Sequence, residues 1–385
     1  MSVKSDDKKF IANTYNRFDL QIIQGNGSIF YDENGKEYID LGTGIAVNTF
    51  GFCDKEWIDA VEKQLEVFQH TSNLYYSEPC VKLAELLSKK TGCKKVFFGN
   101  SGAEANECAI KAARKYAENK GVKNGVILTL VNSFHGRTVT MLAATGQDVF
   151  HNDFLPLTNG FVYAKANDIA DLEKKVNDNP VIAIMFETIQ GEGGVLPLEK
   201  DFVEKINEIA KEKDILMIAD EIQTGNGRTG KLYGYMNYGI TPDIVTTAKG
   251  LGGGLPIGAA MLFEKCENVF DFGSHGSTFG GNPTVCAGAV NVLSRIDDEL
   301  LKSVKEKSDY IFNELNGAKG VKSISGMGLM IGVETEKDSS DVLKKCLENG
   351  VSVLKAKNKI RLLPALNIPF DLLKKAVSVL KSACE

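Results

Sequence analysis

Six short runs of β-branched and aromatic residues constrain the fold of this chain more than any other feature of its sequence. Longer stretches with helical spacing of apolar residues separate the runs, and this alternation is typical of crossover units in a mostly parallel sheet. The sequence therefore predicts an α/β fold with a large domain built on that sheet. The runs are residues 96–99, 126–131, 181–186, 215–219, 244–248 and 258–263.

The two ends of the chain have a different pattern. Residues 27–42 hold two alternating runs around Asn34-Gly35, a turn signal that predicts a small antiparallel hairpin. After Pro283, helical segments and short strands predict a smaller α+β domain, and 385 residues suffice for two hydrophobic cores. We expect an N-terminal segment over 1–50 that packs with the small domain, a large domain over 51–280 and a C-terminal small domain over 281–385.

Composition and charge exclude several classes of protein. A net charge of -5 offers no basic stripe for nucleic acid, so small metabolites are the expected partners. The N-terminus has no apolar signal segment, and the apolar runs are too short to cross a bilayer, so we expect a cytoplasmic protein without a membrane partner. Eight scattered cysteines predict reduced thiols, and four isolated histidines predict no metal site.

Two ionisable residues follow predicted strands, at the sheet edge where α/β folds bind ligands. Lys249 precedes a glycine-rich loop, and burial there would lower the pKa of its amine and leave an unprotonated nucleophile. Asp220 closes the run 215–219, and a buried carboxylate needs a positive partner such as the protonated pyridine nitrogen of pyridoxal phosphate. Each residue alone has an ordinary explanation, a solvent-seeking strand-end lysine for Lys249 and an ion pair or helix cap for Asp220.

A candidate phosphate cradle lies at residues 100–104, where apolar spacing predicts that a helix begins near Gly102 or Ala103. Free N–H groups and the dipole at a helix N-terminus favour an anion. Ser101 and Glu104 also spell a capping box, which would satisfy the same N–H groups without a ligand. A dinucleotide site is excluded at residues 250–254, since the expected glycine spacing and following helix are missing.

Seven motifs together resemble the class III pyridoxal-phosphate aminotransferases, and within that class the acetylornithine aminotransferases are the most similar. The resemblance covers nearly the whole chain and implies a fold-type I enzyme, with helices on both faces of the sheet, that works as a homodimer with shared active sites. The motifs are NSGAEANE (100–107), FHGRT (134–138), ETIQGEGG (187–194), DEIQTGNGRTG (220–230), TTAKGLGGGLPIGA (246–259), STFGGNP (277–283) and RLLPALN (361–367).

The resemblance assigns the residues that would bind the cofactor, pyridoxal 5'-phosphate. Lys249 would form the Schiff base and carry the proton, and Asp220 would pair with the pyridine nitrogen. Phe134 would stack on the ring, unless it is an ordinary core aromatic. The remaining contacts would be Gln223 at the phenolic oxygen, Ser101, Gly102 and Ala103 at the phosphate, and Thr278 of the partner subunit at the same phosphate.

The resemblance also assigns the substrate contacts. Arg137 would bind the α-carboxylate of an acylated amino acid, because a guanidinium fork suits a planar carboxylate. Ser277 would touch the same substrate, or is a simple turn serine. Glu192 would pair with Arg361 while the amino donor is bound and release it for the second carboxylate of glutamate or 2-oxoglutarate; a permanent salt bridge is the alternative.

The expected reaction converts N-acetyl-L-ornithine and 2-oxoglutarate into N-acetyl-L-glutamate 5-semialdehyde and L-glutamate, a step of arginine biosynthesis, by a ping-pong mechanism. Gly44 stands where the ornithine enzymes of the class carry tyrosine, which favours an acylated donor. Succinylornithine, N-succinyl-diaminopimelate, ornithine and 4-aminobutyrate stay open as donors, as do an aminomutase and a non-enzymatic binding protein on this scaffold. Phe52, Cys53 and Asp54 depart from the common G-H-x-H-P pattern, which puts local packing in doubt more than activity.

Overall fold

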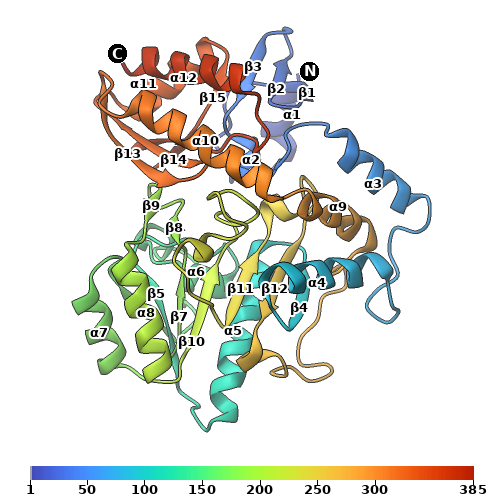
Figure 1. Ribbon diagram of the computed structural model, residues 1–385, viewed down its shortest axis with the longest axis vertical. Helices are drawn as coiled ribbons and strands as arrows, with labels where there is room; N and C mark the ends of the chain where they lie inside the picture. Colours follow the sequence, from blue (N-terminus) through green and yellow to red (C-terminus); the bar gives the residue numbers. More distant parts are fainter. Residues whose placement is uncertain (1) are drawn as a thin grey trace.

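A seven-stranded sheet forms the centre of the computed structural model, which describes residues 2–385 (Figure 1). Only β12 runs antiparallel to its neighbours, so the predicted α/β fold with a mostly parallel sheet is confirmed. In spatial order the strands are β4 (Lys95–Gly99), β12 (Gly258–Leu262), β11 (Ile244–Thr247), β10 (Leu216–Asp220), β7 (Val181–Phe186), β5 (Val126–Leu130) and β6 (Phe161–Ala164).

All six predicted runs are strands of this sheet, and no end differs from its predicted position by more than one residue. The edge strand β6 was not among the predicted runs. Its four residues are all apolar or aromatic, and the first three are only half-buried, as a strand at the edge of the sheet allows. By contrast, every residue of β7 is buried, as a central strand covered on both faces requires.

Helices cover both faces of the sheet, as expected. Alternate residues of β10 enter different hydrophobic clusters: Met217 packs with one layer of helices and Leu216 with the other. The first layer contains α4 (Glu78–Thr91), α7 (Ile169–Asp178), α8 (Lys200–Glu212) and α9 (Pro283–Ser294), and the second contains α5 (Gly102–Asn119) and α6 (Val139–Ala144).

The two chain ends form a second packed unit above the sheet (Figure 1). Strand β15 pairs in parallel with β3, which joins the C-terminal region to the predicted N-terminal hairpin, and that hairpin is confirmed. One sheet has the order β1 (Ile22–Asn26), β2 (Ile29–Asp32), β3 (Glu37–Asp40), β15 (Val351–Ser352), and the other β13 (Val321–Met327), β14 (Met330–Thr335), β17 (Lys359–Leu362), β16 (Leu354–Ala356). The helices packed on them are α10 (Asp298–Leu315), α11 (Ser339–Glu348) and α12 (Phe370–Cys384).

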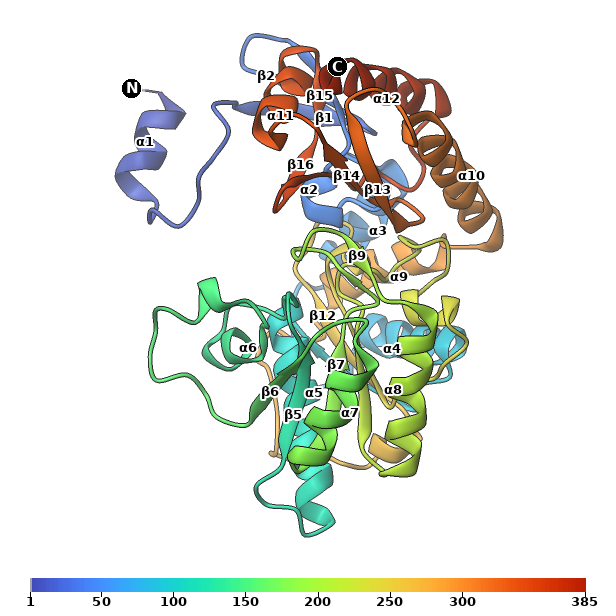
Figure 2. The ribbon, with the colours of Figure 1, turned by 90° about the vertical axis from the view of Figure 1, so that its left-hand side faces the viewer.

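The remaining elements are short or peripheral. Helix α1 (Val3–Phe10) buries none of its residues and stands away from the body (Figure 2). No helix within residues 2–385 is both long and apolar enough to span a membrane. The residue numbers at which the domains divide stay a prediction. The other elements are α2 (Thr43–Ala46), α3 (Lys55–Leu65), β8 (Ile189–Gln190), β9 (Leu196–Pro197) and the 3-10 turns η1 (Asp148–Phe150), η2 (Gly234–Asn237), η3 (Lys249–Leu251) and η4 (Glu264–Cys266).

Candidate active site

A cavity of about 460 Å³ opens at the carboxyl ends of the central strands. Its size lies within the range of small-molecule sites. Most of the predicted site residues line it, although they come from four separate stretches of the chain. These are Ser101, Gly102, Ala103, Phe134, Arg137, Asp220, Gln223 and Lys249; the lining also includes Val47, Asn100, His135, Glu187 and Ile222.

Lys249 lies in the wall of this cavity, immediately after β11. Its backbone has a φ of 46°, a left-handed conformation that is uncommon for a residue with a side chain. Burial lowers the pKa of its amine from the ordinary value, more than the nearby carboxylates of Glu192 and Asp220 raise it. The side chain is therefore placed to act as a nucleophile or a proton acceptor.

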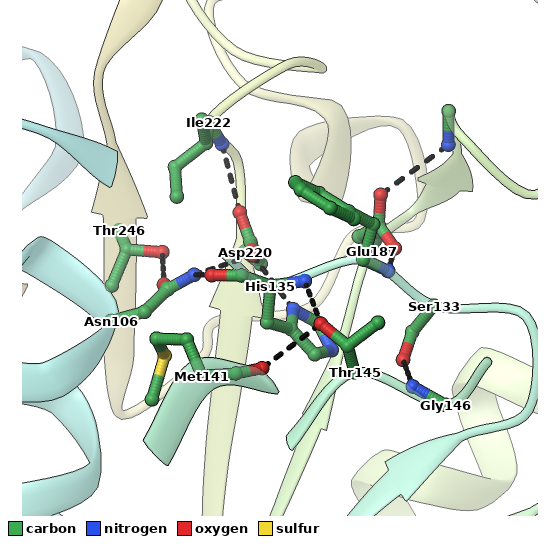
Figure 3. Close-up of polar contacts among 12 residues, drawn as sticks. Asn106, Ser133, His135, Met141, Thr145, Gly146, Glu187, Asp220, Ile222 and Thr246 are labelled. Carbon is green, nitrogen blue, oxygen red and sulfur yellow. Dashed lines mark hydrogen bonds and ion pairs between the residues drawn. The ribbon is translucent and has the colours of Figure 1, made fainter. Parts of the chain in front are cut away.

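Asp220 is fixed from behind by a buried hydrogen-bond network (Figure 3). Its Oδ2 accepts bonds from His135 Nδ1 at 2.7 Å and Asn106 Nδ2 at 2.8 Å, and its Oδ1 accepts one from the Ile222 N–H at 3.1 Å. The Thr246 hydroxyl donates to Asn106 Oδ1 at 2.7 Å, which orients the amide. These bonds fix the orientation of the carboxylate, which lies in the cavity wall.

The start of α5 combines both structures that its sequence allows. Ser101 caps the helix, accepting the Glu104 N–H at 3.2 Å, and the Glu104 carboxylate bonds the backbone N–H of Asn100. No hydrogen bond of the described chain uses the N–H groups of Gly102 and Ala103. The Ser101 cap therefore forms, and the N–H groups of Gly102 and Ala103 remain available to an anion in the cavity.

Gly102 has no room for a side chain, since an added Cβ would lie 2.7 Å from Ile222 Cδ1. Ile222 itself lines the cavity, two residues after Asp220. The helix terminus and the carboxylate are thus held in one packed arrangement.

Arg137 is an exposed cation at the cavity wall. Its guanidinium lies 4.6 Å from the ring centre of Phe150 and 5.7 Å from that of Phe134. Within residues 2–385 it forms no ion pair with a carboxylate. An arginine supported by two aromatic rings and without an internal anion can bind a carboxylate from solution.

Glu192 and Arg361 form an ion pair beside the cavity, with 2.6 Å between Glu192 Oε1 and Arg361 Nη1. The same Nη1 donates to Gln223 Oε1 at 3.1 Å. The arginine side chain is 3% exposed and the glutamate 31%, so the glutamate is the partner that can move toward solvent. Burial works against ionisation of Glu192, but Arg361 holds its pKa below the usual value.

Two of the predicted residues lie outside the cavity wall. Ser277 accepts a hydrogen bond from Asn100 Nδ2 at 3.0 Å and another from the Gly280 N–H at 3.0 Å, so it touches the site only through Asn100. Thr278 is exposed and does not reach the cavity of its own chain. The roles of both residues stay predictions.

Sequence reasoning assigned no role to several buried polar residues of the site. His135 and Glu187 stand inside the quoted motifs FHGRT and ETIQGEGG, next to residues that were assigned. Asn106 lies on the buried face of α5, where a polar residue among alanines signals a required partner. A buried polar residue inside a motif was the signal that could have found all three.

The family profile for class III aminotransferases matches residues 10–384 of the chain. The acetylornithine aminotransferase of Haemophilus ducreyi is 47% identical over 381 residues, covering 98% of this chain and 97% of that protein. The protein of the same name from Methanocaldococcus jannaschii is 42% identical, covering 94% and 92%.

Solved structures show the same relationship. The N-acetylornithine aminotransferase of Stenotrophomonas maltophilia superposes with a TM-score of 0.85 at 33% identity, covering 98% of this chain and 97% of that one. The ornithine aminotransferase of Toxoplasma gondii, described with PLP at its active site, has a TM-score of 0.94 at 32% identity, covering 99% and 93%. With its fold, its cavity and its sequence in agreement from end to end, this chain belongs to the class III aminotransferases.

Proposed function

We propose that this aminotransferase uses pyridoxal phosphate to transfer the amino group of N-acetyl-L-ornithine to 2-oxoglutarate, giving N-acetyl-L-glutamate 5-semialdehyde and L-glutamate. One observation carries the proposal: a half-buried amine with a lowered pKa, a carboxylate and an open helix N-terminus line a single cavity. The named relatives act on acetylornithine by their descriptions, which supports the choice of donor. The reaction would serve arginine biosynthesis.

The donor set of the cavity fits pyridoxal phosphate. The Lys249 amine would bind its aldehyde carbon, the Asp220 carboxylate its pyridinium, and the N–H groups of Gly102 and Ala103 its phosphate. Phe134 would cover the ring, and Gln223 would lie at the phenolic oxygen. When bound, the cofactor supplies an electron sink that stabilises negative charge on the substrate carbon.

The chain's own residues would then bind and orient the substrate and move its proton. Arg137 would hold the α-carboxylate of the acylated donor and direct the terminal amine toward Lys249. Lys249 would take the proton from the substrate carbon that bears the amine and return it to the cofactor carbon on the other side of the same nitrogen, since its lowered pKa leaves more of the amine unprotonated and able to act as a base. Asp220 would keep its positive partner protonated through both steps.

The Glu192–Arg361 pair would let one cavity accept two substrates. Glu192 neutralises Arg361 while a donor without a second carboxylate is bound. Glutamate or 2-oxoglutarate would displace Glu192 and take its place on the arginine, and the partly exposed Glu192 side chain has solvent to move into. Ser277 would complete the contact with the donor.

The donor is tested by comparing kcat/KM for acetylornithine, succinylornithine, N-succinyl-diaminopimelate, ornithine and 4-aminobutyrate, with acetylornithine expected to be highest. Gly44→Tyr should lower the ratio of acetylornithine to ornithine by about tenfold, because a phenol there can hydrogen-bond a free α-amino group. Gly44 has a φ of 62°, where a residue with a side chain costs roughly 1–2 kcal/mol of backbone strain, but an added Cβ would meet no atom within 3.8 Å, so no steric clash adds to that strain. An unchanged ratio in a folded variant would contradict this account of donor choice.

We further propose a homodimer in the cytoplasm, with Thr278 reaching the phosphate site of the partner subunit. Tyr75, Tyr76 and Phe279 are exposed apolar residues beside the Thr278 loop, and Asn73 Nδ2 donates to the Ser277 carbonyl at 2.9 Å. Such a patch is typical of a protein interface. The eight free cysteines suit a reducing compartment.

Replacing both Tyr75 and Tyr76 with glutamate should therefore weaken dimerisation by at least about 100-fold, because two exposed aromatic rings would be lost from an apolar contact. Sedimentation equilibrium of the wild type and the variant measures the effect. Val122→Glu, at an exposed position far from the cavity, is the control and should leave the dimer intact. A monomeric wild-type protein would contradict the proposal.

A further inference from the structure

Glu187, at the end of β7, is a buried carboxylate that the proposed reaction does not use. It is 6% exposed and lines the cavity. Its Oε1 accepts the backbone N–H of Phe134 at 2.9 Å, and its Oε2 accepts the backbone N–H of Gly191 at 3.3 Å (Figure 3). One side chain thus bonds two loops, the loop that carries Phe134 and the turn that carries Glu192.

Few other bonds hold that turn. Within residues 191–195 the N–H groups of Gly194 and Val195 reach the Gly191 carbonyl at 3.4 and 3.3 Å, which are long distances for backbone hydrogen bonds. The far end is anchored where Ser325 Oγ donates to the Val195 carbonyl at 2.8 Å. At the near end, β8 pairs with β9, Gln190 Nε2 donates to the Val131 carbonyl at 2.8 Å, and the Glu187 carboxylate accepts the Gly191 N–H. Glu187 is the ionisable group among these contacts, so a change in its charge alters how the turn that carries Glu192 is held.

We propose that Glu187 is a positioning residue that ties the Phe134 loop to the turn 191–195 and so sets the resting position of the Glu192–Arg361 gate. The role of this gate in choosing between the two substrates rests on the proposed function. The link itself is a property of the protein without any ligand, because both of its hydrogen bonds are internal.

The ionisation of Glu187 should govern the link. Burial raises its pKa to about 7; nearby His135 lowers that pKa and Asp220 raises it. Above that pH the carboxylate accepts both N–H groups, and below it one oxygen carries a proton and no longer serves as a full acceptor. The negative charge of Glu187 also raises the pKa of Lys249 across the cavity. Within the described chain, no cation forms an ion pair with Glu187.

Glu187→Gln imitates the protonated acid at every pH, because an amide has one accepting oxygen and one donating nitrogen. Glu221→Gln is the matched control. Glu221 is also fully buried, burial also raises its pKa to about 7, and it accepts the N–H groups of Gly234 and Tyr235 at 2.7 Å each, away from the gate.

The first test is hydrogen exchange of the apo-protein at pH 8. In Glu187→Gln, exchange in peptides that contain Phe134 and Gly191 should speed up by about tenfold, the effect of losing one charge-assisted hydrogen bond. In Glu221→Gln those peptides should keep the wild-type rate, and peptides around Gly234 should change. Equal changes in both variants, or none near Gly191, would overturn the proposal.

The second test compares the two half-reactions, acetylornithine against glutamate, as kcat/KM from pH 6 to 8.5. The wild-type ratio should fall by about tenfold as the pH drops through 7, because a loosened Glu192 leaves Arg361 free for the second carboxylate. Glu187→Gln should show the low-pH ratio throughout. If the ratio for Glu187→Gln followed the wild-type pH curve, the proposal would be overturned. If the wild-type protein were inactive with both amino acids, the proposed function would be contradicted, and the hydrogen-exchange result alone would decide the role of Glu187.

Discussion

Replacing Lys249 with alanine should lower transamination by at least about 10⁴-fold. Among the described residues that line the cavity, this lysine carries the one amine, so the variant loses both the nucleophile that would hold the cofactor and the base that would move the substrate proton. General acid–base catalysis alone is worth roughly 10² to 10⁴-fold. The measurements are kcat/KM for acetylornithine and the visible absorption of added pyridoxal phosphate, which should resemble that of the free cofactor.

Lys307→Met provides the control for a lost buried lysine. Lys307 is also buried and burial lowers its pKa, but it donates only to the Leu366 carbonyl at 2.8 Å in the other hydrophobic unit. This variant should keep the cofactor absorption of the wild type and lose thermal stability. Activity of Lys249→Ala within tenfold of the wild type would refute the assigned role.

The pH dependence of cofactor uptake gives the same assignment a second check. An amine with a lowered pKa stays unprotonated at a lower pH than free lysine does. Uptake of pyridoxal phosphate by the apo-protein should therefore stay fast to a lower pH than the reaction of free lysine does, and slow only as the pH falls below the lowered pKa. A rate that already declines below pH 10, as for free lysine, would contradict the burial effect.

The sequence predicted the sheet and the cavity lining because both depend on local patterns. Buried strands such as β7 need continuous apolar runs, and their polar ends meet at one edge of a parallel sheet. Edge strand β6 was not predicted although its four residues are all apolar or aromatic, because periodicity alone cannot distinguish so short a run from part of a helix. The separate roles of Lys249 and Asp220 could not be decided from spacing, and the family resemblance supplied them.

The network behind Asp220 could not be predicted for a different reason. Asn106 lies 114 positions from Asp220 and 140 from Thr246, and neither separation has a periodicity that reveals contact. The same holds for Glu187, whose partner Phe134 is 53 positions away. The role of Thr278 could not be predicted from its own chain either, because a residue that would contact the partner subunit's site is simply exposed there.

That network makes the outcome of Asp220→Asn specific. His135 and Asn106 both donate to the Oδ2 position, so the new amide must place its oxygen there and its nitrogen at the position of Oδ1. The nitrogen then faces the Ile222 N–H and the cavity, where it donates to a pyridine nitrogen and keeps it unprotonated. We expect kcat to fall by roughly 10² to 10³-fold, a typical cost of one lost electrostatic contact to a transition state.

The KM for acetylornithine should change little, since Arg137 and the gate are untouched. Asp243→Asn is the matched control, because Asp243 also accepts a backbone N–H, that of Met217 at 2.9 Å, but lies just before β11 at the opposite end of the strands. That variant should lose stability and keep kcat. Steady-state kinetics with cofactor in excess distinguishes the two variants. If kcat of Asp220→Asn were within threefold of the wild-type value, the Asp220 carboxylate would stabilise the fold without contributing to the reaction.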